Sequence, residues 1–184
     1  MKVVGTMFFK NQKLLIDKPR KRPTYQMIGG RVEEGETPLE AAIRECREEL
    51  GDEAIFDSSL IDLVMEFDEI ATSDGKTPIH FYVFKYNGEL KGKIKTSDEI
   101  ESFKWYESKD GQEILSNTLK NEVVPYCLNK KLIKWVSTNT KNNYGRFISR
   151  NDSWYWNRVR AISTNTDTTH VESISVLERI NIEK

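Results

Sequence analysis

Cysteine is scarce in this sequence of 184 residues, which contains only Cys46 and Cys127. Both lie in apolar patterns typical of small buried side chains, and neither is a credible nucleophile or metal ligand. Long apolar runs are also missing, since none approaches the roughly 18 residues of a membrane span. The first 13 residues lack the basic-then-apolar order of a signal peptide. We therefore expect a cytoplasmic protein with no membrane contact.

An excess of charge of either sign is absent as well. The 28 Lys and Arg residues balance 29 Asp and Glu residues, which leaves a net charge of -1. No general basic field exists to hold nucleic acid or an anionic membrane. Apolar residues make up 38% of the chain and aromatic residues 10%, which is enough to fill a core. We expect a globular protein of one domain, or of one domain with a small appendage.

The composition changes near residue 135. In residues 135–184, Ser, Thr and Asn supply 19 of 50 residues, and this stretch has one of the ten glycines and none of the five prolines. We predict a main domain over 1–134 and a small β-rich C-terminal extension over 135–184. Residues 144–150 and 153–162 predict a β-hairpin around Asn151 and Asp152.

Aromatic and basic side chains interleave in that predicted hairpin. They are Tyr144, Phe147, Trp154, Tyr155 and Trp156, with Arg146, Arg150, Arg158 and Arg160. One interpretation is docking onto the main domain or onto a second subunit, which would make a homodimer, because a two-stranded hairpin is marginal alone. The other is stacking against nucleic acid. We favour docking.

Strands and helices are mixed along the main domain without a regular βαβ repeat. Residues 3–9 and 13–17 predict an opening hairpin. Further strands are expected over 60–71, 79–86 and 103–106, and helices over 38–50 and 113–128. This order favours an α/β sandwich over a doubly wound parallel sheet.

The helix over 38–50 has well-marked ends and carries a cluster of acids. Thr37 is a natural N-cap, Glu40 completes a capping box, and Gly51 is placed to end the helix. Glu45, Glu48 and Glu49 share an arc of about 100° on one face. Like charges at this spacing cost about 0.2–0.5 kcal/mol per pair, so a bound cation such as Mg²⁺ or Mn²⁺ would offset their repulsion. A solvated acidic face is the alternative.

The spacing around this helix decides between those alternatives. Residues 30–52 read Gly30, five residues, Glu36, seven residues, then Arg44-Glu45-Cys46-Arg47-Glu48-Glu49-Leu50-Gly51. This segment resembles the signature of the Nudix hydrolases, with every Gly, Glu and Arg position filled. Only the apolar slots depart, at Cys46 and Asp52. Over about 1–130 the strand order resembles the family fold, an α/β/α sandwich with a mixed sheet.

The resemblance implies a MutT-like enzyme that hydrolyses a nucleoside diphosphate linked to another moiety, with Mg²⁺ or Mn²⁺. It implies metal ligands at Glu45, Glu48 and Glu49, with the carbonyl of Gly30 or Gly29 in the same site. Glu36 and Arg44 would orient the loop and the carboxylates. The general base is left open between Glu45, Glu49 and a downstream acid, for which Glu99 is preferred over Glu101 and Asp98.

Residues ahead of the signature are candidates for substrate contacts. Arg20 and Arg22 lie in the basic loop 18–23, which contacts phosphates in one interpretation and is a solvated charge run in the other. Tyr25, Gly29 and Gly30 belong to the segment that the resemblance links to substrate recognition. His80 and His170 are interpreted as structural.

The nucleotide itself is not specified by any motif. We take a house-cleaning nucleoside triphosphate pyrophosphohydrolase as the default. Two alternatives stay open, a Nudix-fold module that senses a nucleotide and a hydrolase directed to RNA by its extension.

Overall fold

The structure is a computed structural model that describes residues 1–70, 75–111, 114–134 and 160–161. The main sheet has the strand order β1-β6-β5-β9, formed by Lys2–Met7, Pro78–Tyr86, Ile61–Ile70 and Arg160–Ala161. β1 runs parallel to β6, whereas β5 is antiparallel to both β6 and β9. The sheet is therefore mixed, as the sequence predicted.

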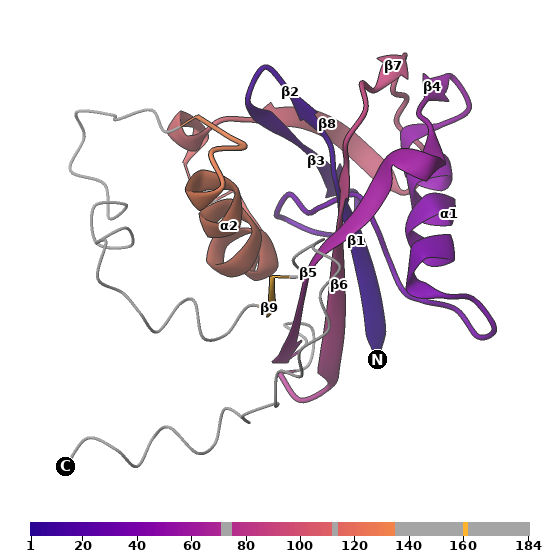
Figure 1. The fold of residues 1–184 in the computed structure, drawn as a ribbon, viewed down its shortest axis with the longest axis vertical. Coiled ribbons are helices and arrows are strands. Elements are labelled where there is room, and N and C mark those ends of the chain that lie inside the picture. The colour runs from indigo at the N-terminus through magenta and orange to yellow at the C-terminus, as the bar shows by residue number, and fades with distance from the viewer. Residues whose placement is uncertain (71–74, 112–113, 135–159, 162–184) are drawn as a thin grey trace, which may run out of the picture.

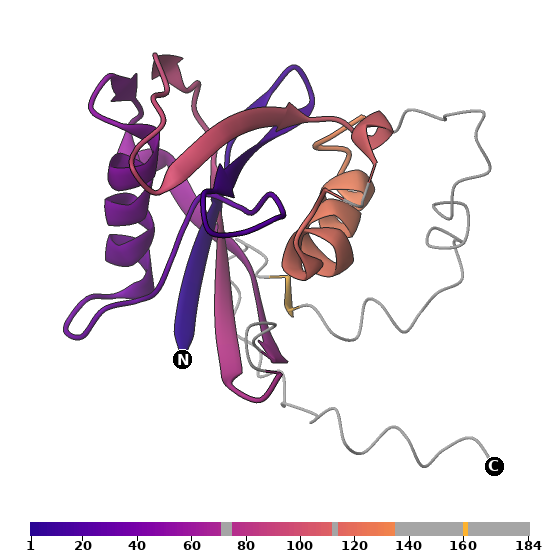
Figure 2. The ribbon, with the colours of Figure 1, turned by 180° about the vertical axis from the view of Figure 1, so that it is seen from behind.

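The central strand β6 is apolar on both faces because layers of structure cover both sides. Ile79, Phe81 and Val83 belong to a core shared with α2 (Val124–Asn129). Phe84 and Tyr86 belong to a core shared with α1 (Pro38–Leu50). Figures 1 and 2 show α1 and α2 on opposite sides of the strands. The architecture is the expected α/β/α sandwich.

A second sheet lies beside the first and carries part of the site. It joins β2 (Phe9–Lys10), β3 (Lys13–Pro19) and β8 (Ile100–Tyr106), all antiparallel. A small pair, β4 (Ala54–Ile55) and β7 (Lys91–Gly92), stands above the end of α1 (Figure 1). Short 3₁₀ turns span Ser58–Leu60 and Ser108–Asp110.

The predicted opening hairpin is only partly correct. Phe9–Lys10 pairs with β3 across a tight turn in which Asn11 and Gln12 both have positive φ, as a two-residue hairpin turn of type I′ requires. Residues 2–7, however, leave that sheet and pair with β6. The chain changes sheets at Phe8, whose ring is fully buried in the core under α1.

The second helix begins later than the sequence predicted. Leu115 forms an isolated bridge with Tyr25, so the chain is extended there. A π-helical turn at Leu119–Val123 precedes α2. Pro125, which has no backbone N–H to donate, lies where the wide turn gives way to the α-helix.

The extension contributes one described strand. Arg160–Ala161 pairs with Met65 and Glu66 at the edge of the main sheet. The rest of the predicted hairpin lies outside the described residues, and the domain boundary at 134 stays a prediction. None of the helices in the described residues is long and apolar enough to cross a membrane.

Candidate active site

Helix α1 is positioned by local signals and by one buried face. Thr37 and Glu40 form the predicted capping box, Pro38 occupies the first turn, and the N–H of Gly51 donates to the carbonyl of Arg47 at the far end. Asp52 therefore does not disturb the helix exit. Ala41, Ala42, Cys46 and Leu50 are buried against the sheets. The helix is thereby fixed with its glutamates beside the segment 28–31.

Two adjacent glycines let the backbone approach both the sheet and the helix. Gly29 has φ of 149°, and a Cβ there would lie 2.2 Å from the Val4 carbonyl oxygen. A Cβ at Gly30 would lie 2.2 Å from the Oε1 atom of Glu45. The N–H of Gly29 donates to the Oε2 atom of Glu49 at 2.7 Å. Four predicted site residues, both glycines and these two glutamates, are thus brought together.

Arg44 lies at the centre of an acidic cluster beside α1 and binds three of its glutamates, Glu36, Glu45 and Glu48. It donates through Nη2 and Nε to the two carboxylate oxygens of Glu36, at 2.7 and 3.2 Å. Its Nη1 atom donates to Glu45 at 2.9 Å and to Glu48 at 3.1 Å. The contacts with Glu36 and Glu45 raise the pKa of Arg44, and the hydrogen bonds from Arg44 lower the pKa of Glu36. Arg44 and Glu36 are therefore arranged as residues that orient the other carboxylates would be, and this role stays a prediction.

Arg44 also changes how the acidic arc should be understood. The sequence suggested that a cation is needed to offset the repulsion among the glutamates, but Arg44 already compensates Glu45 and Glu48. Burial is the main effect on Glu45 and raises its pKa against the influence of Arg44. The remaining glutamate, Glu49, has no ion pair with any residue in the described part of the chain.

A second buried acid, Asp17, affects Glu49, and the sequence analysis missed it. Asp17, on β3, is 1% exposed. Burial raises the pKa of Glu49, and the charge of Asp17 adds to that rise more than the charges of Glu45 and Glu99 do. Burial likewise raises the pKa of Asp17. The available signal was an acidic residue at an inward position of the apolar strand Leu14-Leu15-Ile16-Asp17.

The three downstream acids differ in their surroundings. Glu99 precedes β8 and is exposed, and its charge contributes to the raised pKa of Glu49. Glu101 is instead paired with Lys18 at 3.2 Å. Asp98 is exposed. Electrostatic coupling to Glu49 thus distinguishes Glu99 from Glu101, although its role as a base stays a prediction.

A cavity of about 220 Å³ adjoins the glycine pair. It lies between β1, β6 and the segment before α2, and its lining includes Arg22, Gly29, Gly30, Glu69, Phe81 and Thr118. Thr118 donates to Glu69 at 2.8 Å, and burial raises the pKa of Glu69. Sequence reasoning missed Glu69 and Thr118, because 49 residues separate them and only the folded register brings them together.

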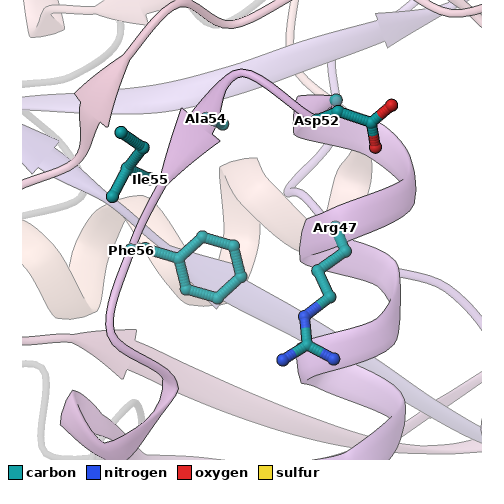
Figure 3. A pocket seen from close by; sticks show the side chains of 6 residues that line it. Arg47, Asp52, Ala54, Ile55 and Phe56 are labelled. Carbon is teal, nitrogen blue, oxygen red and sulfur yellow. The ribbon is translucent and has the colours of Figure 1, made fainter.

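The other two substrate candidates lie apart from this lining. The Tyr25 hydroxyl is 3.3 Å from the Ser102 hydroxyl, and the Arg20 side chain is exposed. A larger hollow of about 360 Å³ opens at the end of α1, where Arg47 and Phe56 face each other (Figure 3). Arg47 is about 160° around the helix from Glu45, so this hollow is on the wrong side for the glutamates.

No group of three or more His, Cys, Asp or Glu side chains within the described residues is gathered as a metal-binding cluster. The carboxylates are directed at Arg44 and at the N–H of Gly29 instead. Cys46 and Cys127 are buried, and burial raises the pKa of Cys46 to about 12. His80 lies between Asp68 and Glu66 and does not line the cavity beside the glycine pair, while His170 is outside the described residues.

The sequence model of the NUDIX domain matches residues 1–127. No curated protein matches the chain in sequence. Among solved structures, a MutT NUDIX hydrolase from Burkholderia pseudomallei is 21% identical with a TM-score of 0.54, and the alignment covers 64% of this chain and 90% of that one. The MutT protein from Methanosarcina mazei is 17% identical with a TM-score of 0.57, covering 71% and 95%.

An Ap4A hydrolase from C. elegans, solved as a binary complex, is 18% identical with a TM-score of 0.53. The alignment covers 70% of this chain and 98% of that one. At these identities the likeness establishes the fold, and the family model covers nearly the whole of the predicted main domain.

Proposed function

The chain belongs to the NUDIX family, and from this we propose that it is a metal-dependent pyrophosphohydrolase cleaving a nucleoside diphosphate linked to another moiety. One observation carries the proposal. Gly29 and Gly30 line the cavity and also contact Glu49 and Glu45. A nucleoside held in the cavity would therefore place its phosphates beside the carboxylates.

The donor set fits a hard divalent cation such as Mg²⁺ or Mn²⁺. Glu45, Glu48, Glu49 and the Gly30 carbonyl are oxygen donors, which these cations prefer. The Gly30 carbonyl oxygen accepts the N–H of Val4 at 2.8 Å, and its second lone pair is left for a cation. When bound, the cation would neutralise the diphosphate and lower the pKa of a coordinated water.

The chain's own residues supply the other requirements of the reaction. Arg44 holds Glu45 and Glu48 on one side, and the Gly29 N–H holds Glu49 on the other. One carboxylate must accept the proton of the attacking water. Glu99 is the candidate for this step, with Glu45 and Glu49 as alternatives, and its electrostatic coupling to Glu49 supports the choice.

The cavity favours a small nucleotide. Its volume is below the roughly 300–1,000 Å³ of sites that enclose a drug-sized ligand, so it accommodates the nucleoside end alone. Arg22 at its edge is exposed and available to a phosphate. We propose a nucleoside triphosphate as the substrate, cleaved to a nucleoside monophosphate and pyrophosphate.

A nucleotide screen with Mg²⁺ tests this proposal. The full-length protein is incubated with nucleoside triphosphates, dinucleoside polyphosphates and nucleotide sugars, and both products are identified by chromatography. In water enriched in heavy oxygen, the labelled product shows which phosphorus is attacked. Release of pyrophosphate from a triphosphate supports the proposal. Hydrolysis of only dinucleoside polyphosphates or nucleotide sugars would support the enzymatic activity but change the substrate. A folded protein that hydrolyses none of these compounds with Mg²⁺ or Mn²⁺ would refute the proposal.

A further inference from the structure

The carboxylate of Asp17 is buried without a partner. Its side chain is 1% exposed, and neither Oδ1 nor Oδ2 accepts a hydrogen bond from any described residue. No Lys or Arg in the described part of the chain forms an ion pair with it. The neighbouring basic residue, Lys18, forms an ion pair with Glu101 instead. A buried carboxylate in this situation destabilises the fold unless something else satisfies its oxygens.

The fold places this carboxylate on the side of α1. Side chains alternate along a strand, so Asp17 shares a face of β3 with Leu15, which packs in the core under α1. The backbone of Asp17 is held by reciprocal hydrogen bonds with Gln26, at 3.1 and 2.7 Å. Three residues after Gln26, the N–H of Gly29 binds Glu49. Asp17 is therefore fixed at the same edge of the site as Glu49.

The two acids form the one part of the cluster that the described chain leaves without a positive charge. Glu36, Glu45 and Glu48 all receive hydrogen bonds from Arg44. Glu49 receives only the Gly29 N–H among the described residues, and the buried Asp17 charge acts on it. Two carboxylates held together in a buried place repel each other, and a divalent cation is the ligand that would reverse this cost.

We propose that Asp17 is a fifth oxygen donor of the cation site, and that its buried, unpartnered oxygens complete with Glu49 the half of the site that Arg44 does not compensate. The inference rests on the proposed function, because it assigns a residue to the cation which that function requires. Asp17 lies on β3, outside the segment 30–52 that carries the other donors.

The test compares cation binding with stability in the absence of a cation. Mn²⁺ is titrated into the full-length wild-type protein and the Asp17→Asn variant, and free Mn²⁺ is followed by its paramagnetic resonance signal. Asn keeps the shape of the side chain and removes its charge. We expect Mn²⁺ binding to weaken by at least about tenfold, the scale seen for residues around metal ligands. Thermal melting with a chelator should show a higher melting temperature for the variant, because a buried charge is gone.

One control variant and one alternative substitution complete the test. Glu53→Gln removes an exposed carboxylate that pairs with Lys95 beyond the end of α1, and it should leave Mn²⁺ binding unchanged. Asp17→Ser is the second substitution if the Asn variant does not fold. Mn²⁺ affinity within about twofold of wild type in a folded Asp17 variant would overturn the inference, because it would show that the Asp17 oxygens do not contact the cation.

The same titration separates this inference from the proposed function. If Glu49→Gln weakens Mn²⁺ binding and Asp17→Asn does not, the metal-dependent function stands and only the role of Asp17 fails. If the wild-type protein binds no Mn²⁺, the metal dependence fails and the role of Asp17 fails with it.

Discussion

The acidic cluster at α1 has two sides that are built differently. On one side, Arg44 binds Glu36, Glu45 and Glu48 through three nitrogens, at distances between 2.7 and 3.2 Å. On the other side, Glu49 accepts one backbone N–H, from Gly29, and the buried oxygens of Asp17 accept no hydrogen bond from the described residues. Neither acid is paired with a positive side chain in the described part of the chain. The negative charges of the first side are balanced within the described chain, whereas those of the second side are not.

This difference separates the two purposes that a charge can serve in one cluster. An acid that finds an arginine within the chain contributes to the shape of the site, and it does so whether or not a ligand is bound. An acid buried beside another acid costs stability in the free protein and regains it when a cation binds. The comparison therefore predicts that removing the charge of Glu49 or Asp17 stabilises the free protein, whereas weakening the contacts of Arg44 destabilises it.

The largest expected effect comes from the glutamates of the helix. Glu49→Gln and Glu48→Gln should each lower turnover by about 10³-fold, because a metal ion contributes several kcal/mol to catalysis and 1.36 kcal/mol is tenfold in rate. Their stabilities should differ. Glu49→Gln relieves repulsion and raises the melting temperature without metal, while Glu48, which is 58% exposed, leaves it nearly unchanged. Steady-state rates with Mg²⁺ and thermal melting measure both.

The control is Glu53→Gln, which removes one exposed charge near the same helix and should change neither rate nor stability. Near-normal rates in both glutamate variants would show that the metal ligands are assigned wrongly. A lower melting temperature for Glu49→Gln would contradict the idea that its side of the cluster is uncompensated.

The next effect concerns the downstream acids on or before β8. Glu99→Gln should lower turnover by about 10²-fold, at the low end of what a general base contributes. Glu101→Gln is the matched comparison, because Glu101 is engaged by Lys18 and should lose far less. The ratio of the two rates, measured with saturating Mg²⁺, is the test. Equal and small losses would return the role of base to Glu45 or Glu49.

Sequence reasoning was most successful where structure is local. The ends of α1 follow from Thr37, Glu40 and Gly51, all within one turn of the helix termini, and the structure confirms each of them. The glutamates and glycines of the cluster could be named because their spacing is fixed within some twenty residues. Arg44 could be assigned a supporting role but not its partners, which depend on side-chain directions.

Features set by distant pairing were missed. The first strand was given to a local hairpin, whereas its partner is β6, more than 70 residues away. Asp17 was overlooked because its inward position matters only when β3 is known to face α1. Glu69 and Thr118 meet across 49 residues. Each of these depends on how segments far apart in the chain pair or pack, which a single sequence does not specify.

A smaller effect is expected from the compensated side of the cluster. Arg44→Lys keeps the charge but loses the fork that binds Glu36 through two nitrogens. We expect a loss of about 1–2 kcal/mol in the free energy of unfolding, limited because the side chain is partly exposed. Turnover should fall by about tenfold as Glu45 and Glu48 lose their alignment. Denaturant unfolding and steady-state rates test this. A stability equal to that of the wild type would mean that the paired hydrogen bonds of Arg44 to Glu36 do not stabilise the fold.

The smallest effect concerns His80, a charged side chain outside the acidic cluster whose charge is also balanced within the chain. It tests whether such a charge stabilises the fold without taking part in catalysis. His80 lies 2.6 Å from Asp68 and 3.2 Å from Glu66 across the strands β5 and β6. Burial lowers the pKa of His80, but the hydrogen bonds to the two acids outweigh it and the pKa is raised. The stabilisation is therefore complete below the unfolded pKa of about 6.5 and is lost as the pH rises through the higher folded pKa. In melting experiments, His80→Asn should be less stable than wild type at about pH 6, and the gap should close towards about pH 8.5. Turnover should stay within about twofold of wild type, because His80 is paired with Asp68 and Glu66 and does not line the cavity beside the glycine pair. A gap that does not change with pH would show that His80 is neutral in the fold, and a collapse of turnover would place it in the active site.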